Sequence, residues 1–521
     1  MRPTGDHRGR ASRFDVIVVG AGAAGAALAA RLAEDPDRTV LVLESGPVPG
    51  LPPSFAPELL DARLVPGAQP GHPAVQPYPA LLAPGRPYTV VRGRVLGGST
   101  TVNGGYFVRA RREDFDRWAA AGGGPVWSYE RMLPFLRALE TDLDYGAGPL
   151  HGDRGPVRVR RTDLGHPAAA AFGAAARRLG FPGEPDKNAQ DEPGFGPVPS
   201  NAVDGVRVNT GLAYLSRVSG RSNLLVSGDS TVLGVVVERG RATGVVVERD
   251  GRRRTVRGGE VVLCAGALRS PQLLLLSGVG PRAELAALGI PVVEDVPAVG
   301  ARFGDHPQVV LEWLPRRRSL PEPVGSWLGG ALHLPSSGGD HPGGDLEILQ
   351  SLVPMAGLTG GRVSVPGAPL AFLVSVQTPR SGGRLRLDSA DPAAPPSLDH
   401  GYLATAGDRR RLREVVRVTA ELAATPDFAE VGAGLTDPAP RVLADDRLLD
   451  EWILGHLGTC QHTCGTVPLG SAVDAYGRVH GVAGLRVADT SILPTPPLRG
   501  PAATAVLVGE LVADAMRRGL T

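Results

Sequence analysis

The sequence predicts an α/β protein that begins with a parallel βαβ unit, and three features near the N-terminus support this prediction. Residues 16–19 are consecutive apolar residues, three of them valines, which suits a strand buried on both faces. A helical stretch follows from Ala23 to about Ala33, and a second apolar strand covers residues 39–43. Strands that alternate with helical segments in this order indicate a parallel sheet.

The turn between the first strand and the helix has the pattern of a dinucleotide-binding site. Gly20, Gly22 and Gly25 follow the G-x-G-x-x-G spacing, which allows a tight turn, a close approach of the backbone to a pyrophosphate, and close packing of the helix on the strand. The second strand ends at Glu44, whose carboxylate can accept hydrogen bonds from a ribose 2′-hydroxyl and would repel a 2′-phosphate. FAD or NAD therefore fits better than NADP. The alternative is an ordinary βαβ turn without a ligand, but the ordered set of strand, glycines, helix, strand and acid favours the nucleotide.

Bulk properties narrow the class of protein further. A chain of 521 residues is long enough for two or more lobes, and a formal net charge of +2 argues against a nucleic-acid-binding surface. The first thirteen residues are polar and basic rather than a signal peptide, and no apolar run is long enough to span a bilayer. Three cysteines do not make a disulfide framework. We therefore predict a cytoplasmic protein without a transmembrane segment, and leave peripheral association with a membrane open.

Two further segments are rich in small residues. Residues 92–103 are too dense in Gly and Ser for a core segment, and are typical of a loop entering a helix, with amides and hydroxyls facing an anion or a flavin ring. Residues 260–280 read as a strand, a glycine turn and a helix. Together with the N-terminal pattern, they resemble the two signature segments of the glucose–methanol–choline (GMC) oxidoreductases. Residues 297–307 and 477–494 also resemble motifs of that family, so the resemblance extends from Phe14 to the C-terminus.

The resemblance implies an FAD-binding Rossmann-like lobe interleaved with an α+β substrate lobe built on an antiparallel sheet. We expect the FAD lobe at residues 14–150, 206–305 and 456–521, and the substrate lobe at 151–205 and 306–455. Some family members attach FAD through a histidine at the position of Val102, so the resemblance implies FAD that is bound without a covalent bond. The residues expected to bind it are Gly20, Gly22, Ala23, Ala24, Gly25, Glu44, Ser45, Arg94, Gly97, Gly98, Ser99, Asn103, Gly104, Val232, Ala265, Gly266, Asp489, Ala502 and Thr504.

Local patterns predict several other elements. Residues 231–248 alternate apolar and polar side chains around a central Arg-Gly-Arg, which predicts a hairpin. Residues 372–376 read as a strand, and residues 408–424 and 502–518 have helical spacing. The Pro-rich, polar stretch of some fifty residues from Pro47 onward reads as an extended excursion between elements.

The chemistry is expected near residues 459–466, where the resemblance transfers the family's motif histidine to His462. Oxidation of an alcohol removes a proton from oxygen and a hydride from carbon, and the flavin takes the hydride. Imidazole suits the proton because its ordinary pKa lies near neutrality. An isolated histidine is more often structural, and we interpret His306 and His480 in that way. No residue is expected to bind a metal ion, because Cys460, His462 and Cys464 are too few for a zinc site.

The sequence departs from the family near the start of the last helix. Most members carry a second His or Asn there, but Gly500 and Ala502 occupy those places in this chain. The second hydrogen-bond partner of the substrate oxygen is therefore missing, or it comes from Gln461, His456 or Arg499. A substrate hydroxyl that is activated by its own neighbours would need less help.

The main hypothesis is an FAD-dependent dehydrogenase that acts on CH–OH groups, with His462 as the base. Within the family, the sequence most resembles the oxidoreductase of the mycofactocin system, which implies mycofactocinol as the substrate and electrons passed toward the respiratory chain. Two alternatives stay open: an alcohol oxidase that produces hydrogen peroxide, and a lyase that keeps FAD without using its redox chemistry. The expected partners are a small-molecule alcohol or a reduced redox cofactor and an unknown electron acceptor.

Overall fold

The apolar strand near the N-terminus lies in the middle of a seven-stranded sheet. In the computed structural model, which describes residues 13–50, 54–316, 320–338, 341–360 and 367–520, β1 (Phe14–Val19) pairs in parallel with β2 (Val40–Leu43) and β14 (Arg252–Leu263). Strand β11 (Leu224–Ser227) continues the parallel sheet beyond β2, and β25 (Leu485–Val487) joins β14. The predicted parallel βαβ unit is confirmed.

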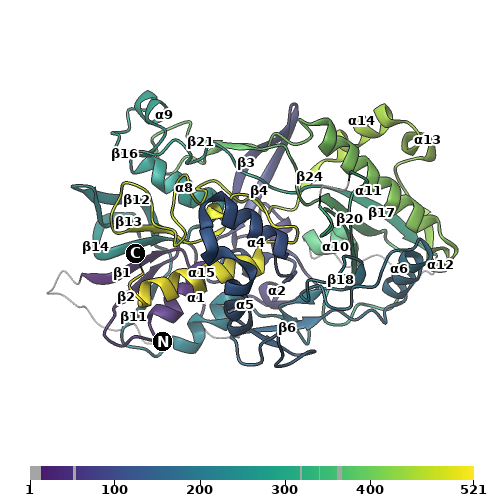
Figure 1. Ribbon diagram of the computed structural model, residues 1–521, viewed down its shortest axis with the longest axis horizontal. Helices are drawn as coiled ribbons and strands as arrows, with labels where there is room; N and C mark the ends of the chain where they lie inside the picture. The colour runs from purple at the N-terminus through teal and green to yellow at the C-terminus, as the bar shows by residue number, and fades with distance from the viewer. Residues whose placement is uncertain (1–12, 51–53, 317–319, 339–340, 361–366, 521) are drawn as a thin grey trace.

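Two helices pack closely beside this sheet. In α1 (Ala23–Leu32), a Cβ atom at Gly25 would lie 2.1 Å from the carbonyl oxygen of Gly20, so only glycine allows this approach of helix and strand. The C-terminal helix α15 (Ala502–Arg517), predicted at 502–518, packs on α1. A Cβ atom at Gly509 would lie 2.3 Å from the carbonyl oxygen of Ala24. Figure 1 shows the two helices side by side. The close contact holds the start of α15 near the glycine turn.

The long strand β14 also joins the parallel sheet to an antiparallel meander. Its first half pairs with β13 (Arg241–Arg249), which pairs with β12 (Thr231–Glu238). The hairpin predicted at 231–248 is therefore confirmed.

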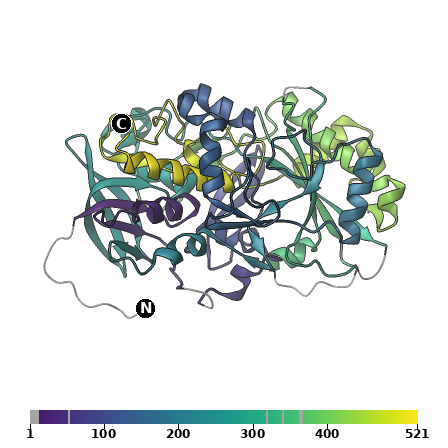
Figure 2. The ribbon, with the colours of Figure 1, turned by 60° about the horizontal axis from the view of Figure 1, so that its bottom comes forward.

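The second lobe is built on another seven-stranded sheet, which is antiparallel. Its order is β23 (Gly432–Leu435), β17 (Pro307–Pro315), β20 (Leu370–Val376), β19 (Leu346–Ser351), β18 (Leu328–Leu334) and β7 (Phe195–Pro197), with β24 (Gly458–Thr459) paired to β17. Helices gather at its outer end: α6 (Pro167–Arg178), α11 (Ala406–Ala424), α12 (Pro426–Ala429), α13 (Pro440–Leu443) and α14 (Asp446–His456). Figure 2 shows the two sheets side by side. The predicted α/β class with an interleaved antiparallel lobe is confirmed.

A hairpin joins the two lobes and lies inside the stretch that we predicted to be an extended excursion. Strands β3 (Val75–Ala83) and β4 (Arg86–Gly93) pair with each other, and β3 also pairs with β22 (Ser397–Asp399), which pairs with β21 (Arg384–Arg386). The expectation missed this sheet because two prolines interrupt β3, and prolines are usually confined to edge strands and bulges.

The remaining elements are short. The helices are α2 (Pro57–Leu60), α3 (Ser99–Val102), α4 (Arg112–Trp118), α5 (Tyr129–Ala138), α7 (Thr210–Ala213), α8 (Gly266–Leu276), α9 (Arg282–Ala287) and α10 (Met355–Gly360). Short helical turns are η1 (Pro66–Ala68), η2 (Ala119–Gly123), η3 (Gly124–Trp127), η4 (Leu215–Val218) and η5 (Thr490–Ile492). The strands are β5 (Glu140–Asp142), β6 (Val157–Arg161), β8 (Pro199–Ser200), β9 (Ala202–Val203), β10 (Val206–Arg207), β15 (Val279–Gly280) and β16 (Glu294–Asp295).

Two large hydrophobic cores accompany the two main sheets. Most of their residues follow the predicted segments, but Leu82 and Ala83 of β3 belong to the core beside the antiparallel sheet, and Leu385 and Leu398 belong to the core beside the parallel sheet. Strand β24 also joins the antiparallel sheet, although it lies within 456–521, which we assigned to the FAD lobe. The lobes therefore exchange short pieces at their boundary. In the described parts of the chain, no helix is both long and apolar enough to cross a bilayer.

Candidate active site

A cavity of about 1020 Å³ runs between the two lobes. The glycine turn after β1 lines part of it, and side chains of β17, β19 and β24 line another part. The cavity therefore connects the predicted nucleotide-binding motif to the segment that contains His462.

At the glycine turn, two loops approach each other through their backbones. A Cβ atom at Gly98 would lie 2.7 Å from the Cα of Gly22, and the amide of Gly97 donates to the carbonyl of Ala21 over 2.9 Å. Backbone thus forms the wall of the cavity here, as a bound pyrophosphate requires. The predicted cofactor-binding residues that line the cavity are Gly20, Gly22, Ala23, Ala24, Glu44, Ser45, Arg94, Gly98, Ser99, Asn103, Gly104, Val232, Ala265, Gly266, Asp489 and Ala502.

Three predicted cofactor-binding residues do not line the cavity. Gly25 packs against the Gly20 carbonyl, Gly97 joins the two loops, and the Thr504 side chain is buried inside α15. The neighbouring Ala505 lines the cavity instead. Gly25 and Gly97 therefore shape the site through close packing of the backbone.

The two predicted acids are held by backbone amides. Glu44 accepts from the amides of Ala21 and Gly46, both over 2.9 Å, and burial raises the pKa of its carboxyl group. Asp489 accepts from Gly266 at the start of α8 over 2.8 Å, and burial raises its pKa as well. Each carboxylate oxygen has a second lone pair, so Glu44 can still receive a ribose hydroxyl.

Some residues that line the cavity on the side of the glycine turn were not predicted from the sequence. Residues 392–395 line the cavity, and their carbonyl groups accept from two side chains of α8: Arg269 donates to Pro392 over 3.1 Å, and Gln272 donates to Ala394 over 2.8 Å. Tyr78 of β3 lines the cavity too. The Asp391-Pro392 pair predicts a turn, but nothing in the local sequence predicts that this turn packs against α8.

His462 follows an unusual backbone conformation. Gln461 has a φ of +61°, which is uncommon for a residue other than glycine, and its side-chain oxygen accepts from the Val91 amide over 2.9 Å. The amide of His462 donates to Asp305 over 2.7 Å. The Asp305 carboxylate also accepts from the Thr463 hydroxyl over 2.7 Å. These contacts fix the His462 backbone at the wall of the cavity.

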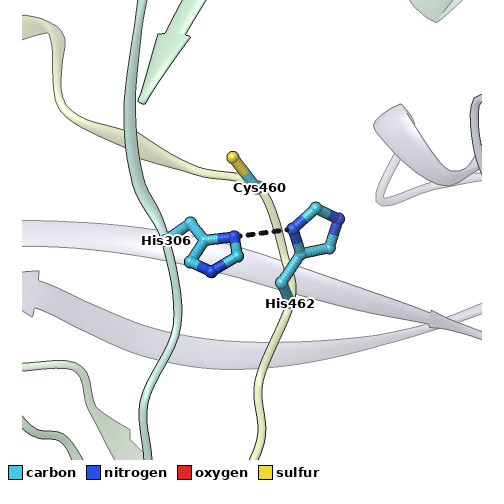
Figure 3. Close-up of side chains that lie close together, drawn as sticks. All are labelled: His306, Cys460 and His462. Atoms are coloured by element: carbon cyan, nitrogen blue, oxygen red, sulfur yellow. Dashed lines mark hydrogen bonds between the residues drawn. The ribbon is translucent and has the colours of Figure 1, made fainter. Parts of the chain in front are cut away.

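His306, which we interpreted as a structural residue, lies directly against His462. The Nδ1 atoms of the two rings are 2.9 Å apart, and the ring planes are almost perpendicular, at 88° (Figure 3). Asp305 accepts from the amide of His306 as well, over 2.7 Å. The sequence signal was the block at 297–307, but strand β17 places it beside β24 only in the folded chain.

Cys460 lies near this pair of histidines. One ligand-type atom each from His306, Cys460 and His462 lie within 4.8 Å of one another (Figure 3). Gln308 donates to the sulfur of Cys460 over 3.2 Å, and burial raises the pKa of its thiol, so the sulfur is protonated. The expectation that no metal is needed stays a prediction.

The electrostatic surroundings keep both imidazoles neutral near pH 7. Burial lowers the pKa of His462, although the carboxylates of Asp305 and Glu347 oppose this shift. Burial and the neighbouring His462 lower the pKa of His306 to about 3. Burial alone would raise the pKa of Asp305, but His400 lowers it well below its usual range, so this acid is ionised. A neutral His462 is able to accept a proton.

The three candidate auxiliary residues lie in different surroundings. Gln461 lines the cavity with its side-chain oxygen already bound to β4, and His456 lines it with half of its side chain exposed and Nδ1 2.7 Å from the Trp452 carbonyl. Arg499 does not line the cavity: its buried guanidinium donates to the carbonyls of Gly343 and Gly344, both over 3.0 Å. The structure therefore contradicts a direct role for Arg499 at the substrate.

The place of the missing second partner is filled by an aromatic ring. A Cβ atom at Gly500 would lie 3.0 Å from Cδ1 of Tyr106 and 3.3 Å from Cε1 of His462. Tyr106 lines the cavity, and nothing in its local sequence pointed to it. A Cβ atom at position 500 would require these rings to shift by a few tenths of an ångström.

The two interleaved lobes share a cavity that joins a G-x-G-x-x-G turn to a pair of adjacent histidines, and this arrangement defines an α/β protein with a dinucleotide-binding motif and a second, antiparallel lobe. The family models described as GMC oxidoreductase match residues 14–308 and 379–509. The chain therefore belongs to the GMC oxidoreductase family, as its motifs predicted.

Individual relatives agree with this assignment. The chain is 40% identical over 510 residues to an uncharacterised GMC-type oxidoreductase in the thcA 5′ region of Rhodococcus erythropolis, covering 95% of this chain and 97% of the relative. It is 33% identical to an oxygen-dependent choline dehydrogenase of Chromohalobacter salexigens, covering 98% and 95%. The crystal structure of pyridoxine 4-oxidase from Mesorbium loti superposes with a TM-score of 0.89 at 27% identity, covering 97% of this chain and 99% of that one.

Proposed function

We propose that this protein is an FAD-dependent oxidoreductase that oxidises a CH–OH group, with His462 as the base that takes the hydroxyl proton. One observation carries the proposal: a single cavity is lined both by the dinucleotide motif and by His462. The names of a choline dehydrogenase and a pyridoxine oxidase among its relatives support the same reaction class. Bound FAD would supply the two-electron acceptor that takes the hydride from carbon.

The residues that line the cavity fit FAD. The backbone wall at Gly22 and Gly98 suits a pyrophosphate, and Glu44 suits a ribose hydroxyl. The start of α15 lies at the cavity, where backbone N–H groups and the helix dipole favour negative charge. Cavity-lining Val102 has no nucleophile, so we expect FAD to be held without a covalent bond.

The bound cofactor should therefore leave when the protein unfolds. Acid precipitation should release all the yellow flavin into the supernatant, where its absorbance is measured after neutralisation. A yellow pellet that keeps its flavin after washing would show that another side chain attaches it.

The histidine pair supports a defined role for each ring. Both rings are neutral, so each carries one N–H, and the contact between the two Nδ1 atoms needs one donor and one acceptor. We assign the Nδ1 proton to His462, which then donates to Nδ1 of His306. His462 then has its lone pair on Nε2, where it receives the substrate proton. Asp305 positions both rings by holding their backbone amides.

The proposal also names an electron acceptor and a natural substrate. We propose a dehydrogenase that uses an acceptor other than oxygen, with mycofactocinol as the candidate substrate and the respiratory chain as the destination of the electrons. Gly500 supports this choice, because the site has no second polar side chain at that position and a hydroxyl beside a carbonyl needs less help to lose its proton.

The test is an anaerobic titration of the purified yellow protein. We expect loss of the visible flavin absorbance with a CH–OH substrate, and we would compare simple alcohols with reduced mycofactocin. Bleaching by simple alcohols alone would remove the mycofactocin assignment. Rapid recolouring in air would identify the peroxide-producing oxidase. A flavin that no compound bleaches would contradict alcohol oxidation and favour the lyase.

A further inference from the structure

The substrate part of the cavity has a second polar wall, formed by residues that no motif identified. Tyr106 follows α3, and its backbone forms an isolated bridge with Ser200. Its ring occupies the space in front of Gly500, where a Cβ atom would lie 3.0 Å and 3.2 Å from its ring carbons. The side chain absent at position 500 is thus replaced in space by Tyr106, next to the ring of His462.

The Tyr106 hydroxyl is tied to a buried carboxylate. It donates to Oε2 of Glu347 over 2.8 Å, and Nε2 of His333 lies 2.9 Å from the same oxygen. Glu347 and His333 come from the neighbouring strands β19 and β18. Glu347 lines the cavity and is only 5% exposed.

A lysine behind His333 fixes the direction of these hydrogen bonds. Lys187, the only lysine of the chain, is fully buried, and its Nζ lies 3.1 Å from Nδ1 of His333 and 2.7 Å from Glu184. An ammonium group only donates, so Nδ1 of His333 accepts and its Nε2–H donates to Glu347. Burial would raise the pKa of Glu347, but His333 and Tyr106 lower it to about 2, so this carboxylate is ionised.

One oxygen of Glu347 keeps acceptor capacity. Oε2 receives Tyr106 and His333, whereas the contact of Oε1 with a described residue is long, 3.4 Å to Nε2 of Gln377. On the same face of the sheet, Ser375 and Gln308 are in register with Glu347, and Val310, Leu349 and Leu373 line the cavity beyond them. An ionised acceptor with one weakly occupied oxygen gains from a donor and repels an anion.

We propose that Glu347, oriented by Tyr106 and His333, binds a second hydrogen-bond donor of the substrate, so that the site selects alcohols with a further hydroxyl or ammonium group and rejects hydroxy acids. The proposal rests on the proposed alcohol oxidation and names its substrate class. Tyr106 and His333 act as positioning residues, and Glu347 is the specificity-determining residue.

The first test uses the FAD-loaded wild-type protein. Two series of primary alcohols are compared anaerobically: butan-1-ol, propane-1,3-diol, 3-aminopropan-1-ol and 3-hydroxypropanoate, and then heptan-1-ol, hexane-1,6-diol, 6-aminohexan-1-ol and 6-hydroxyhexanoate. The measured quantity is the ratio of the rate constant for flavin bleaching to the dissociation constant of the substrate. This ratio should be about 10–100-fold larger for the diols and amino alcohols than for the alkanols. The hydroxy acids should be the poorest members of each series.

The second test measures binding without turnover. Hexylamine and hexanoate have no hydroxyl group, so their binding is followed by the shift that they cause in the oxidised flavin spectrum. Glu347→Gln should weaken hexylamine binding about 10–100-fold and leave hexanoate binding unchanged or tighter. Tyr106→Phe, which keeps the ring, should weaken it about 2–10-fold. The matched control is Glu312→Gln on β17, a carboxylate of the same sheet that does not line the cavity.

The outcomes separate this proposal from the proposed function. Equal rates for diols and alkanols, or hexylamine binding that Glu347→Gln leaves unchanged, would overturn the selectivity while alcohol oxidation stands. Tight hexylamine binding that is lost in Glu347→Gln, with no alcohol bleaching the flavin, would support the donor site and contradict the proposed reaction. If Glu347→Gln does not retain flavin, Tyr106→Phe and the wild-type series decide the question.

Discussion

Replacing His462 with alanine should leave flavin binding intact and slow the oxidation of the substrate about 10²–10⁴-fold, the usual contribution of a well-placed acid–base group. The expectation rests on three features of His462: its imidazole is neutral, its backbone amide is held by Asp305, and its Nδ1 lies 2.9 Å from Nδ1 of His306. The hydrogen bond of the His462 ring goes to His306 and not to the glycine turn, so we expect its removal to leave the nucleotide-binding motif undisturbed. The rate of anaerobic bleaching, followed by stopped-flow absorbance at saturating substrate, measures the effect.

A matched histidine variant checks that the loss is local. His480 lies exposed in a turn, does not line the cavity and contacts the carbonyl of Gly470, so His480→Ala should bleach at the wild-type rate. A His462→Ala protein that retains full flavin content and bleaches as fast as wild type would remove this imidazole from the mechanism.

Replacing His151 with alanine should have the largest effect on stability. Nδ1 of His151 lies 3.0 Å from Glu140 and 2.9 Å from Asp142, and its Nε2 lies 2.7 Å from Asp186. Because the carboxylates are buried, removal of the cation leaves them incompletely compensated. We expect a loss of about 3–5 kcal/mol in the free energy of unfolding at pH 6.

The pH dependence of this loss has a defined sign. Burial would lower the pKa of His151, but its hydrogen bonds to the carboxylates of Asp142, Asp186 and Glu140 raise it to about 10, against 6.5 for an ordinary histidine. Its stabilisation is complete below about pH 6.5 and disappears as the pH rises through 10. Urea unfolding followed by circular dichroism should therefore show a wild-type advantage over His151→Ala that is large at pH 6 and small at pH 10. An advantage that stays constant over this range, or none at pH 6, would contradict the ionic role. His480→Ala serves as the control again.

The parts of the fold that could be predicted are those with local signals. The βαβ unit follows from the apolar runs and the glycine spacing, and α15 follows from its helical periodicity. The β3–β4 hairpin could not be predicted, because Pro77 and Pro79 argue against a strand in the interior of a sheet. Strand β22, which comes from a segment more than three hundred residues away, pairs with Ala80 and Leu81 and thus beyond both prolines.

The site, like the fold, could be predicted only where the signal is local. The motifs predicted His462 and most of the expected cofactor-binding residues that line the cavity, because these positions lie within short, recognisable segments. His306 was assigned only a structural role because its neighbour across β17 and β24 is 156 residues away. Tyr106 and Glu347 have no local signature at all, and only the pairing of strands and the glycine at position 500 bring them together.

A crystal structure of the protein with FAD bound would test most directly whether His462 is the base. We expect the isoalloxazine between the start of α15 and the imidazole of His462, with Nε2 of that ring open toward the reacting edge and Nδ1 still paired with His306. A flavin seated elsewhere, or a His462 ring that points away from it with another side chain in its place, would contradict this role of His462.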